Sequence, residues 1–228
     1  MIGALARPPV ARVFRTPRAL LALGGWCVLG LGFAVAARSG GSANGADHVL
    51  VSAYGALVLP LLAYTLVGAV LGPRSLAAST APLARFGAAP ARAAAVTVGV
   101  ALLGGVVLAA GLGAVVAVVA HGAGDPPVAR DALESAYAGA LGGAAYVAWF
   151  AMGASFGKRG GGRTGLLVVD WVLGLAGGAL AVVTPRAHLR NLLGGTAPMD
   201  WSGRASALAL VVIAAACVAV AVRRAGRE

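Results

Sequence analysis

Long runs of apolar residues alternate with short polar segments along this chain, and the polar segments hold nearly all of its charges. A helix needs about 20 mostly apolar residues to cross a bilayer. Six runs meet this requirement, over residues of about 19–38, 49–72, 93–120, 132–157, 164–184 and 205–222. Pro73 and Pro185 end the second and the fifth run. The pattern therefore predicts an all-α integral membrane protein, a single transmembrane domain (residues 1–228) built as a bundle of about six helices.

The composition points to lipid rather than water as the surroundings of this bundle. Of the residues, 60% are hydrophobic and 11% are charged, and the mean hydropathy is +0.89. Soluble domains average about 25% charged residues, so a soluble fold is excluded. Cys27 and Cys217 both lie inside apolar runs. This placement predicts small core residues rather than a disulfide framework.

The net charge of +11 indicates topology rather than nucleic-acid binding. If the N-terminus is cytoplasmic, most of the 18 Lys and Arg residues fall in cytoplasmic segments, as the positive-inside rule requires. We therefore expect a multi-pass protein of the cell (inner) membrane with both termini in the cytoplasm. The basic segments are expected to contact anionic membrane lipids.

Residues 1–18 are basic and carry scattered apolar side chains. This mixture predicts an amphipathic helix that lies on the cytoplasmic leaflet, in which Pro8 and Pro9 break or start the helix. The alternative is a disordered basic tail.

The loop between the second and third runs is the most informative polar segment. Its first half predicts a short helix, with Ser75 as the N-cap and Gly87 at the end, and Pro82 is expected to split it. Such a helix on the cytoplasmic side offers a surface to a partner, whereas the alternative is a plain connecting loop. The residues of this candidate surface are Arg74, Ser75, Leu76, Leu83, Arg85 and Phe86.

The segment after the fifth run is half apolar, although a simple turn needs no such residues. We expect a short helix in the outer interface, anchored at headgroup level by Trp201. Its candidate residues are His188, Leu189, Leu192, Leu193 and Trp201. The remaining histidines, His48 and His121, also fall at outer ends of runs, but none has a ligand partner at metal-binding spacing. We expect interfacial polar residues and no metal site.

Asp170 is an acidic residue about six residues inside the fifth predicted span. A charge in the membrane is costly, so such a residue is a candidate for function. We expect an ion pair with Arg163 or with a basic residue of another helix, and the alternative is a role in transport. Pairs of glycines at 104–105, 142–143 and 177–178, and Gly153 with Gly157, are typical of close helix packing.

No enzyme signature is present. The segment KRGGGR at 158–163 lacks the Gly spacing and the Ser or Thr of a phosphate-binding loop, and it follows a membrane run rather than a strand. The sequence therefore predicts neither catalysis nor a cofactor bound by this chain.

The order of these segments resembles the permease subunit of type-2 ATP-binding-cassette (ABC) exporters, over nearly the whole chain. The stretch RSLAASTAPLARFGAAPARAAAV (74–96) is similar to the cytoplasmic coupling region of that family. The stretch TPRAHLRNLLGG (184–195) is similar to its outer re-entrant segment.

This resemblance implies a bacterial membrane-spanning permease that works with a separate cytoplasmic ABC ATPase, which binds the ATP. A second permease copy or a related permease would complete the pathway, and the ATPase would dock on the loop 74–85. The coupling loop departs from the family pattern because it has no acidic residue. Two alternatives remain open: a membrane accessory or structural subunit without transport activity, and an ion-coupled or metal- or haem-handling transporter that uses Asp170 or the outer histidines.

Overall fold

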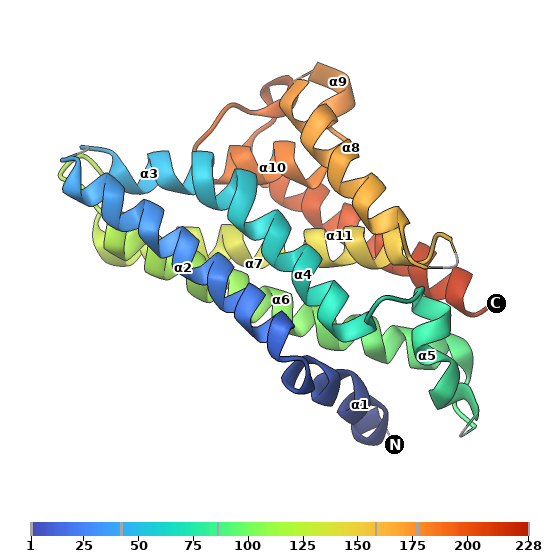
Figure 1. Cartoon of the computed structure of the whole chain (residues 1–228). Coiled ribbons are helices and arrows are strands. Elements are labelled where there is room, and N and C mark those ends of the chain that lie inside the picture. The colour runs from blue at the N-terminus through green and yellow to red at the C-terminus, as the bar shows by residue number, and fades with distance from the viewer. Residues whose placement is uncertain (1, 42, 86, 158, 177, 228) are drawn as a thin grey trace.

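The computed structural model describes residues 2–41, 43–85, 87–157, 159–176 and 178–227, and within these ranges the chain forms helices and no strand. The longest helices lie side by side along one bundle (Figure 1). The elements are α1 (Ile2–Arg15), α2 (Pro17–Ser39), α3 (Gly45–Val49), the π-helix η1 (Leu50–Val58), α4 (Leu59–Leu71), α5 (Leu76–Arg85), α6 (Pro90–Ala120), α7 (Val128–Ala154), α8 (Gly162–Ala176), α9 (Gly178–Ala181), α10 (Pro185–Leu192), the 3₁₀ turn η2 (Pro198–Asp200) and α11 (Gly203–Ala225).

Among the described residues, four helical segments are long and apolar enough to cross a membrane. They match the first, second, third and sixth predicted spans, and their bounds are Pro17–Ser39, Gly45–Leu83, Pro90–Ala120 and Gly203–Ala225. The predicted helical, membrane-compatible character of the chain is therefore confirmed, whereas six crossings are not.

The fourth predicted span corresponds to α7, which begins and ends slightly earlier than 132–157. This helix is the centre of the bundle, since it contacts α4, α6, α8, α10 and α11. Its surface is therefore covered mainly by protein, and it is built from Gly, Ala and aromatic residues rather than from long aliphatic ones. A central helix does not need the high hydropathy of a lipid-facing one.

The fifth predicted span, 164–184, is not one continuous helix. α8 ends at Ala176, and α9 begins at Gly178, whose φ of +69° is left-handed and cannot continue an α-helix. With 15 residues, α8 is about 22 Å long, shorter than the ~30 Å hydrocarbon core. The chain then turns back, and α10 enters the bundle, where it contacts α7, α8, α11 and η1.

Glycines hold α6 and α7 together, as the small residues in both runs predict. A Cβ at Gly143 would lie 2.6 Å from the carbonyl oxygen of Gly105, and a Cβ at Gly105 would lie 2.5 Å from Val147 Cγ2. Gly157 and Gly178 have a different role, since each has a positive φ at the end or start of a helix. Gly177 lies outside the described residues.

The N-terminal segment forms the predicted helix, but its prolines do not interrupt it. Pro8 and Pro9 both lie inside α1. α1 packs against α2, α4 and α6, and Arg12 Nη1 donates a hydrogen bond of 2.7 Å to the carbonyl of Val70 at the end of α4. These tertiary contacts offset part of the helix stability that is lost because Pro8 and Pro9 have no backbone N–H to donate. Phe14 on the opposite side is 70% exposed, as a membrane-surface helix requires.

Different elements lie at the two ends of the bundle (Figure 1). α1, α5 and the C-terminus lie at one end. The connections from α2 to α3 and from α6 to α7 meet at the other, where the N–H of Gly124 donates to the carbonyl of Ala43 at 2.8 Å.

Candidate functional site

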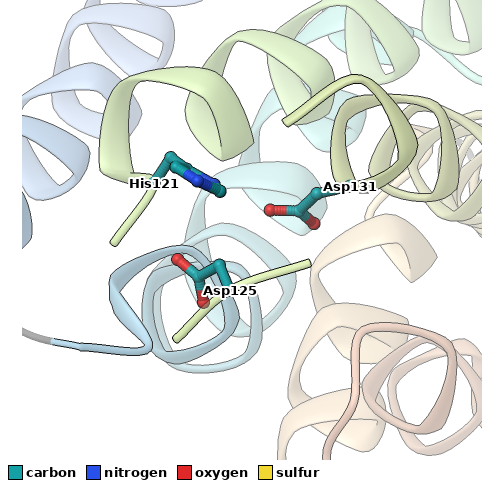
Figure 2. A group of neighbouring side chains, drawn as sticks. All are labelled: His121, Asp125 and Asp131. Atoms are coloured by element: carbon teal, nitrogen blue, oxygen red, sulfur yellow. The ribbon is translucent and has the colours of Figure 1, made fainter. Parts of the chain in front are cut away.

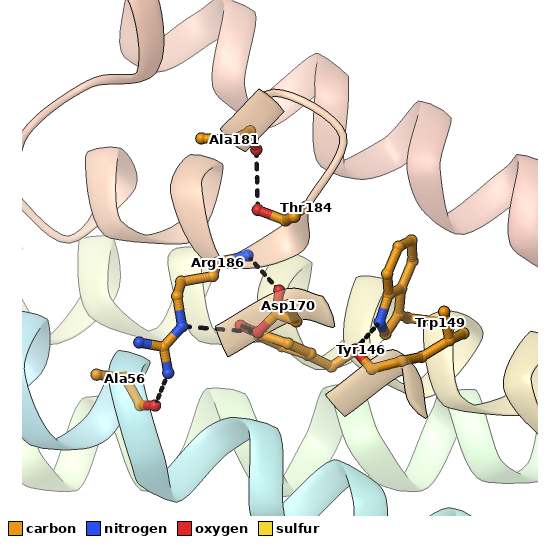
Figure 3. Close-up of polar contacts among 8 residues, drawn as sticks. Ala56, Tyr146, Trp149, Asp170, Ala181, Thr184 and Arg186 are labelled. Atoms are coloured by element: carbon orange, nitrogen blue, oxygen red, sulfur yellow. Dashed lines mark hydrogen bonds and ion pairs between the residues drawn. The ribbon is translucent and has the colours of Figure 1, made fainter. Parts of the chain in front are cut away.

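A buried ion pair joins α8 to α10 (Figure 3). Asp170 of α8 is fully buried, and its Oδ2 lies 3.6 Å from Nε of Arg186. The backbone N–H of Arg186 donates to Asp170 Oδ1 at 3.1 Å, and the hydroxyl of Tyr146 from α7 donates to Oδ2 at 2.9 Å. A buried charge is tolerated only when it is paired and hydrogen-bonded, and Asp170 receives both kinds of support.

The start of α10 explains how Arg186 reaches this position. Pro185 occupies the first helical position, where its missing N–H costs nothing. The N–H of Arg186 is one of the free donors at a helix start, and it points to Asp170. The guanidinium of Arg186 also donates to the carbonyl of Ala56, inside the π-helix η1. π-Helical turns within α-helices occur frequently at functional sites.

The partner of Asp170 is thus a basic residue of another helix, one of the two expected arrangements, and it is not Arg163. The Nη2 of Arg163 donates instead to the carbonyl of Gly72 at 3.3 Å, and its guanidinium lies 6.0 Å from the ring centroid of Tyr64. Arg163 therefore ties the start of α8 to the end of α4. Whether the Asp170 pair serves structure or transport stays a hypothesis.

His188 lies in the interior of the protein. It is fully buried, its Nε2 lies 2.7 Å from the carbonyl oxygen of Val182, and its Nδ1 lies 3.3 Å from Ser206 Oγ. Asn191 Nδ2 donates to the same Ser206 oxygen at 2.8 Å. These bonds attach α10 to α11, so His188 and Asn191 position the re-entering segment.

The leucines of this segment also point inward. Leu189 is fully buried, and its Cδ1 would lie 2.9 Å from a Cβ at Gly142. Leu193 is 5% exposed and approaches Gly55 in the same way. Glycines of α7 and η1 open space for these two leucines, so both pack inside the protein, and the position of the segment in the outer interface stays a prediction. Leu192 and Trp201 are half-buried, and the Trp201 ring centroid lies 5.3 Å from that of His188.

The predicted helix after the second span is present as α5. Ser75 Oγ accepts a hydrogen bond from the N–H of Ala78 at 3.3 Å, which confirms the predicted N-cap. Leu76 is fully buried, and α5 packs against α6 and α11. Pro82 lies inside the helix and does not split it.

One side of α5 is exposed at the residues whose side chains the structure describes. Ala78, Ala81 and Pro82 are exposed, as is Arg74 just before the helix, while Leu83 is half-buried. Arg85 is the last residue of α5. Phe86, also predicted for this surface, lies outside the described residues.

An apolar groove of about 840 Å³ runs along α11. Its lining includes Trp149 and Met152 of α7, Val182 and Val183 after α9, and Leu208 and Val212 of α11. A groove with this lining fits acyl chains or other apolar groups.

Sequence reasoning missed Tyr146 and Arg186 as partners of Asp170. Arg186 carried a usable signal, because the Thr-Pro-Arg sequence at the end of an apolar run favours a new helix with a free N–H at the Arg. Tyr146 carried none, since its contact depends on how α7 packs against α8.

Comparison of this chain with protein-family models, with curated proteins and with solved structures finds no match.

Proposed function

We propose that this protein is the membrane-spanning permease subunit of an ABC-type exporter, driven by a separate cytoplasmic ATPase. The proposal includes a bacterial inner-membrane location, six crossings with the α8–α9 segment as an incomplete fifth one, and cytoplasmic termini. The ATP site belongs to the partner, and the pathway would need a second permease copy or a related one.

The observation that carries this proposal is α5, a short capped helix at the end of the bundle where both termini lie. It is held to the body by buried Leu76, Ser79 and Thr80, and it leaves its outer side exposed. A helix that is rigidly attached yet exposed is suited to pass a movement of a docked ATPase to α4 and α6. Plain connecting loops do not need this anchoring.

The charges near α5 favour a cytoplasmic position for this end. Arg163 joins the start of α8 to Gly72 after α4, and Arg224 Nε donates to the carbonyl of Ser155 at 3.2 Å, so three basic segments meet there. Exposed arginines of these segments, of α1 and of the start of α2 are Arg7, Arg15, Arg18, Arg74, Arg92, Arg159, Arg223 and Arg227. An acidic ATPase surface or anionic lipid would complement them.

The re-entering segment and the groove support a transport role. α10 enters the bundle from the end of α8–α9 and is shielded by protein on several sides, as irregular backbone at membrane depth must be. The apolar groove beside α11 offers a lipid-exposed path for an apolar substrate or for contact with a second copy.

The test is purification through a C-terminal tag from native membranes, with photo-crosslinking residues placed at Ala78 and Ala81. We expect an ABC-type ATPase in stoichiometric amount, crosslinked from both positions and not from the control position Asn44 at the opposite end. Reproducible absence of any ATPase from intact, folded protein would favour the accessory-subunit alternative. Crosslinks from Asn44 alone would contradict docking on α5.

A further inference from the structure

Three side chains with metal-binding atoms converge at the end of the bundle opposite the termini (Figure 2). His121 follows α6, Asp125 lies in the connection to α7, and Asp131 lies in the first turn of α7. One ligand atom from each side chain lies within 4.8 Å of the others. The connection between two long helices thus brings one imidazole and two carboxylates to a single point.

Each of these side chains has a buried polar atom without a hydrogen-bond partner: His121 Nδ1, Asp125 Oδ1 and Asp131 Oδ2. Asp131 is only 5% exposed, and its other oxygen is 3.4 Å from the Ser135 hydroxyl. Buried polar groups are satisfied in nearly all native structures, so three unpartnered atoms in one place call for a common partner. An imidazole nitrogen and carboxylate oxygens can all donate lone pairs to one metal ion, so a cation is a partner that suits all three atoms.

No basic side chain fills this role among the described residues. Neither Asp125 nor Asp131 takes part in an ion pair there, because the nearby Arg130 pairs with Glu134 at 2.7 Å on the exposed side of α7. The carboxylate of Asp47 adds a further negative charge that acts on Asp131. The local field therefore attracts a cation.

The backbone around the cluster is held in place. Asp125 Oδ2 accepts hydrogen bonds from the N–H of Ala46 at 3.0 Å and from that of Gly122 at 2.8 Å, which leaves its Oδ1 to face the cluster. A Cβ at Gly124 would collide with Asn44 Oδ1. The α2–α3 and α6–α7 connections therefore pack so closely that only glycine fits at position 124. Such outer hydrogen bonds orient metal ligands in known sites.

We propose that His121, Asp125 and Asp131 form a binding site for a divalent transition-metal ion of the Zn²⁺ type. An imidazole with two carboxylates suits Zn²⁺, which takes N and O ligands at about 2.0–2.2 Å, better than Ca²⁺ or Mg²⁺, which prefer all-oxygen sites. Three protein ligands leave one tetrahedral position for water. The side chains draw closer together when the ion binds, which fastens the α2–α3 connection to the α6–α7 connection. This inference does not depend on the proposed transport function.

The experiment uses full-length protein in mild detergent, purified through a tag without histidine and stripped of metal with a chelator. Zn²⁺ is titrated by calorimetry, and Co²⁺ binding is followed by its visible absorption. We expect one ion per chain and a rise in melting temperature on adding Zn²⁺, because a ligand of the native state stabilises it. His121→Ala, Asp125→Asn and Asp131→Asn should each weaken Zn²⁺ binding by at least about tenfold.

The controls are Asp47→Asn, which removes a nearby charge without removing a ligand, and His48→Ala, which removes the neighbouring exposed histidine. Both should keep one ion per chain and lose less than about threefold in affinity. The assignment is overturned if the wild-type protein binds neither Zn²⁺ nor Co²⁺, or if Asp131→Asn binds as the wild type does. Loss of binding in His48→Ala with retention in His121→Ala would also overturn it, as would binding of Ca²⁺ in preference to Zn²⁺. Equal melting temperatures of metal-free variants and wild type exclude misfolding as the cause.

Discussion

Arg186 is the residue at which the re-entering segment is fixed to the rest of the bundle. Its side chain lies across α8 because position 174 is glycine: a Cβ there would be 2.6 Å from Arg186 Cδ. Its charge contacts Asp170 on α8 and the carbonyl of Ala56 on η1. Because both charges are buried, loss of one leaves the other without compensation, which typically costs about 3–5 kcal/mol.

Asp170→Leu and Arg186→Met are therefore each expected to destabilise the protein strongly, by about 3–5 kcal/mol in unfolding free energy. The double variant Asp170→Leu with Arg186→Met should be less destabilised than the sum of the single changes, because it leaves no unpaired charge. Thermal unfolding in detergent measures all three. Arg204→Met, at an exposed position of α11, is the matched control and should melt like the wild type. Additive losses in the double variant would show that the pair is not coupled.

At the scale of single residues, the sequence identifies Asp170 as a candidate but does not identify the side chains that contact it. Asp170 stood out because it is an acid within an apolar run, and charge there needs a reason. Its partner followed from the turn after α9, which brings Arg186 back into the bundle, and no local pattern encodes that return. His121 stands at the end of an apolar run in the sequence, and Asp125 and Asp131, four and ten residues beyond it, match no familiar metal-ligand spacing. The Pro-Pro pair at 126–127 was the available signal, since it turns the chain back on itself.

Helix packing in this bundle depends on glycine at specific positions. Gly143→Ala should lower the unfolding free energy by about 1–3 kcal/mol, because the added Cβ would meet the backbone of Gly105 at 2.6 Å and backbone cannot move as a side chain does. Gly111→Ala on α6 is the matched control, since nothing lies within 4 Å of its Cβ position. It should leave stability unchanged or raise it by up to about 1 kcal/mol through helix propensity. Melting curves of the two variants in the same detergent provide the comparison, and equal curves would refute close packing of α6 on α7.

The ends of most long helices could be predicted from the sequence, whereas the break in the fifth run could not. The ends of the first three long helices and of α11 lie within a few residues of the predicted bounds, because apolar runs and prolines mark them directly. The fifth run was predicted incorrectly as one continuous helix, because a glycine such as Gly178 can either allow close helix packing or break a helix by adopting a positive φ. Composition cannot distinguish these two roles of glycine. Only the tertiary position of α10 requires the helix to break at this point.

α1 packs against α2, α4 and α6, and a hydrogen bond from Arg12 adds a polar contact to this packing. Arg12→Met keeps the aliphatic stem but removes the hydrogen bond to the carbonyl of Val70. A charged hydrogen bond is worth about 1.5–3 kcal/mol, so local opening of α1 should become more frequent by at least about tenfold. Hydrogen–deuterium exchange of residues 3–15 measures this opening. Arg15→Met removes an exposed charge from the same helix and should leave exchange unchanged. Equal exchange in the two variants would mean that apolar contacts alone hold α1.

The whole molecule is electrically asymmetric, and this asymmetry predicts its orientation. Exposed arginines surround α5 and the C-terminus, whereas Asp47, Asp125 and Asp131 gather at the opposite end with few basic residues. Basic ends stay in the cytoplasm during insertion, so the acidic end and its proposed metal site should face outward. Metal would then reach the site without crossing the membrane.

Cysteine labelling in intact cells tests this orientation, in a background with Cys27 and Cys217 replaced by Ala. Asn44 and Arg159 suit the test because both are exposed, Asn44 in the α2–α3 connection and Arg159 in the α7–α8 connection. These two connections lie at opposite ends of the bundle (Figure 1). Gly160 does not, since it has a φ of +64° and a Cβ there would lie 2.8 Å from the carbonyl oxygen of Arg74. A membrane-impermeant maleimide should label Asn44→Cys in intact cells, and Arg159→Cys only after the membrane is opened. Labelling of both positions from outside would contradict a crossing between them, and the reverse pattern would place α5 outside the cell, where no cytoplasmic ATPase can dock.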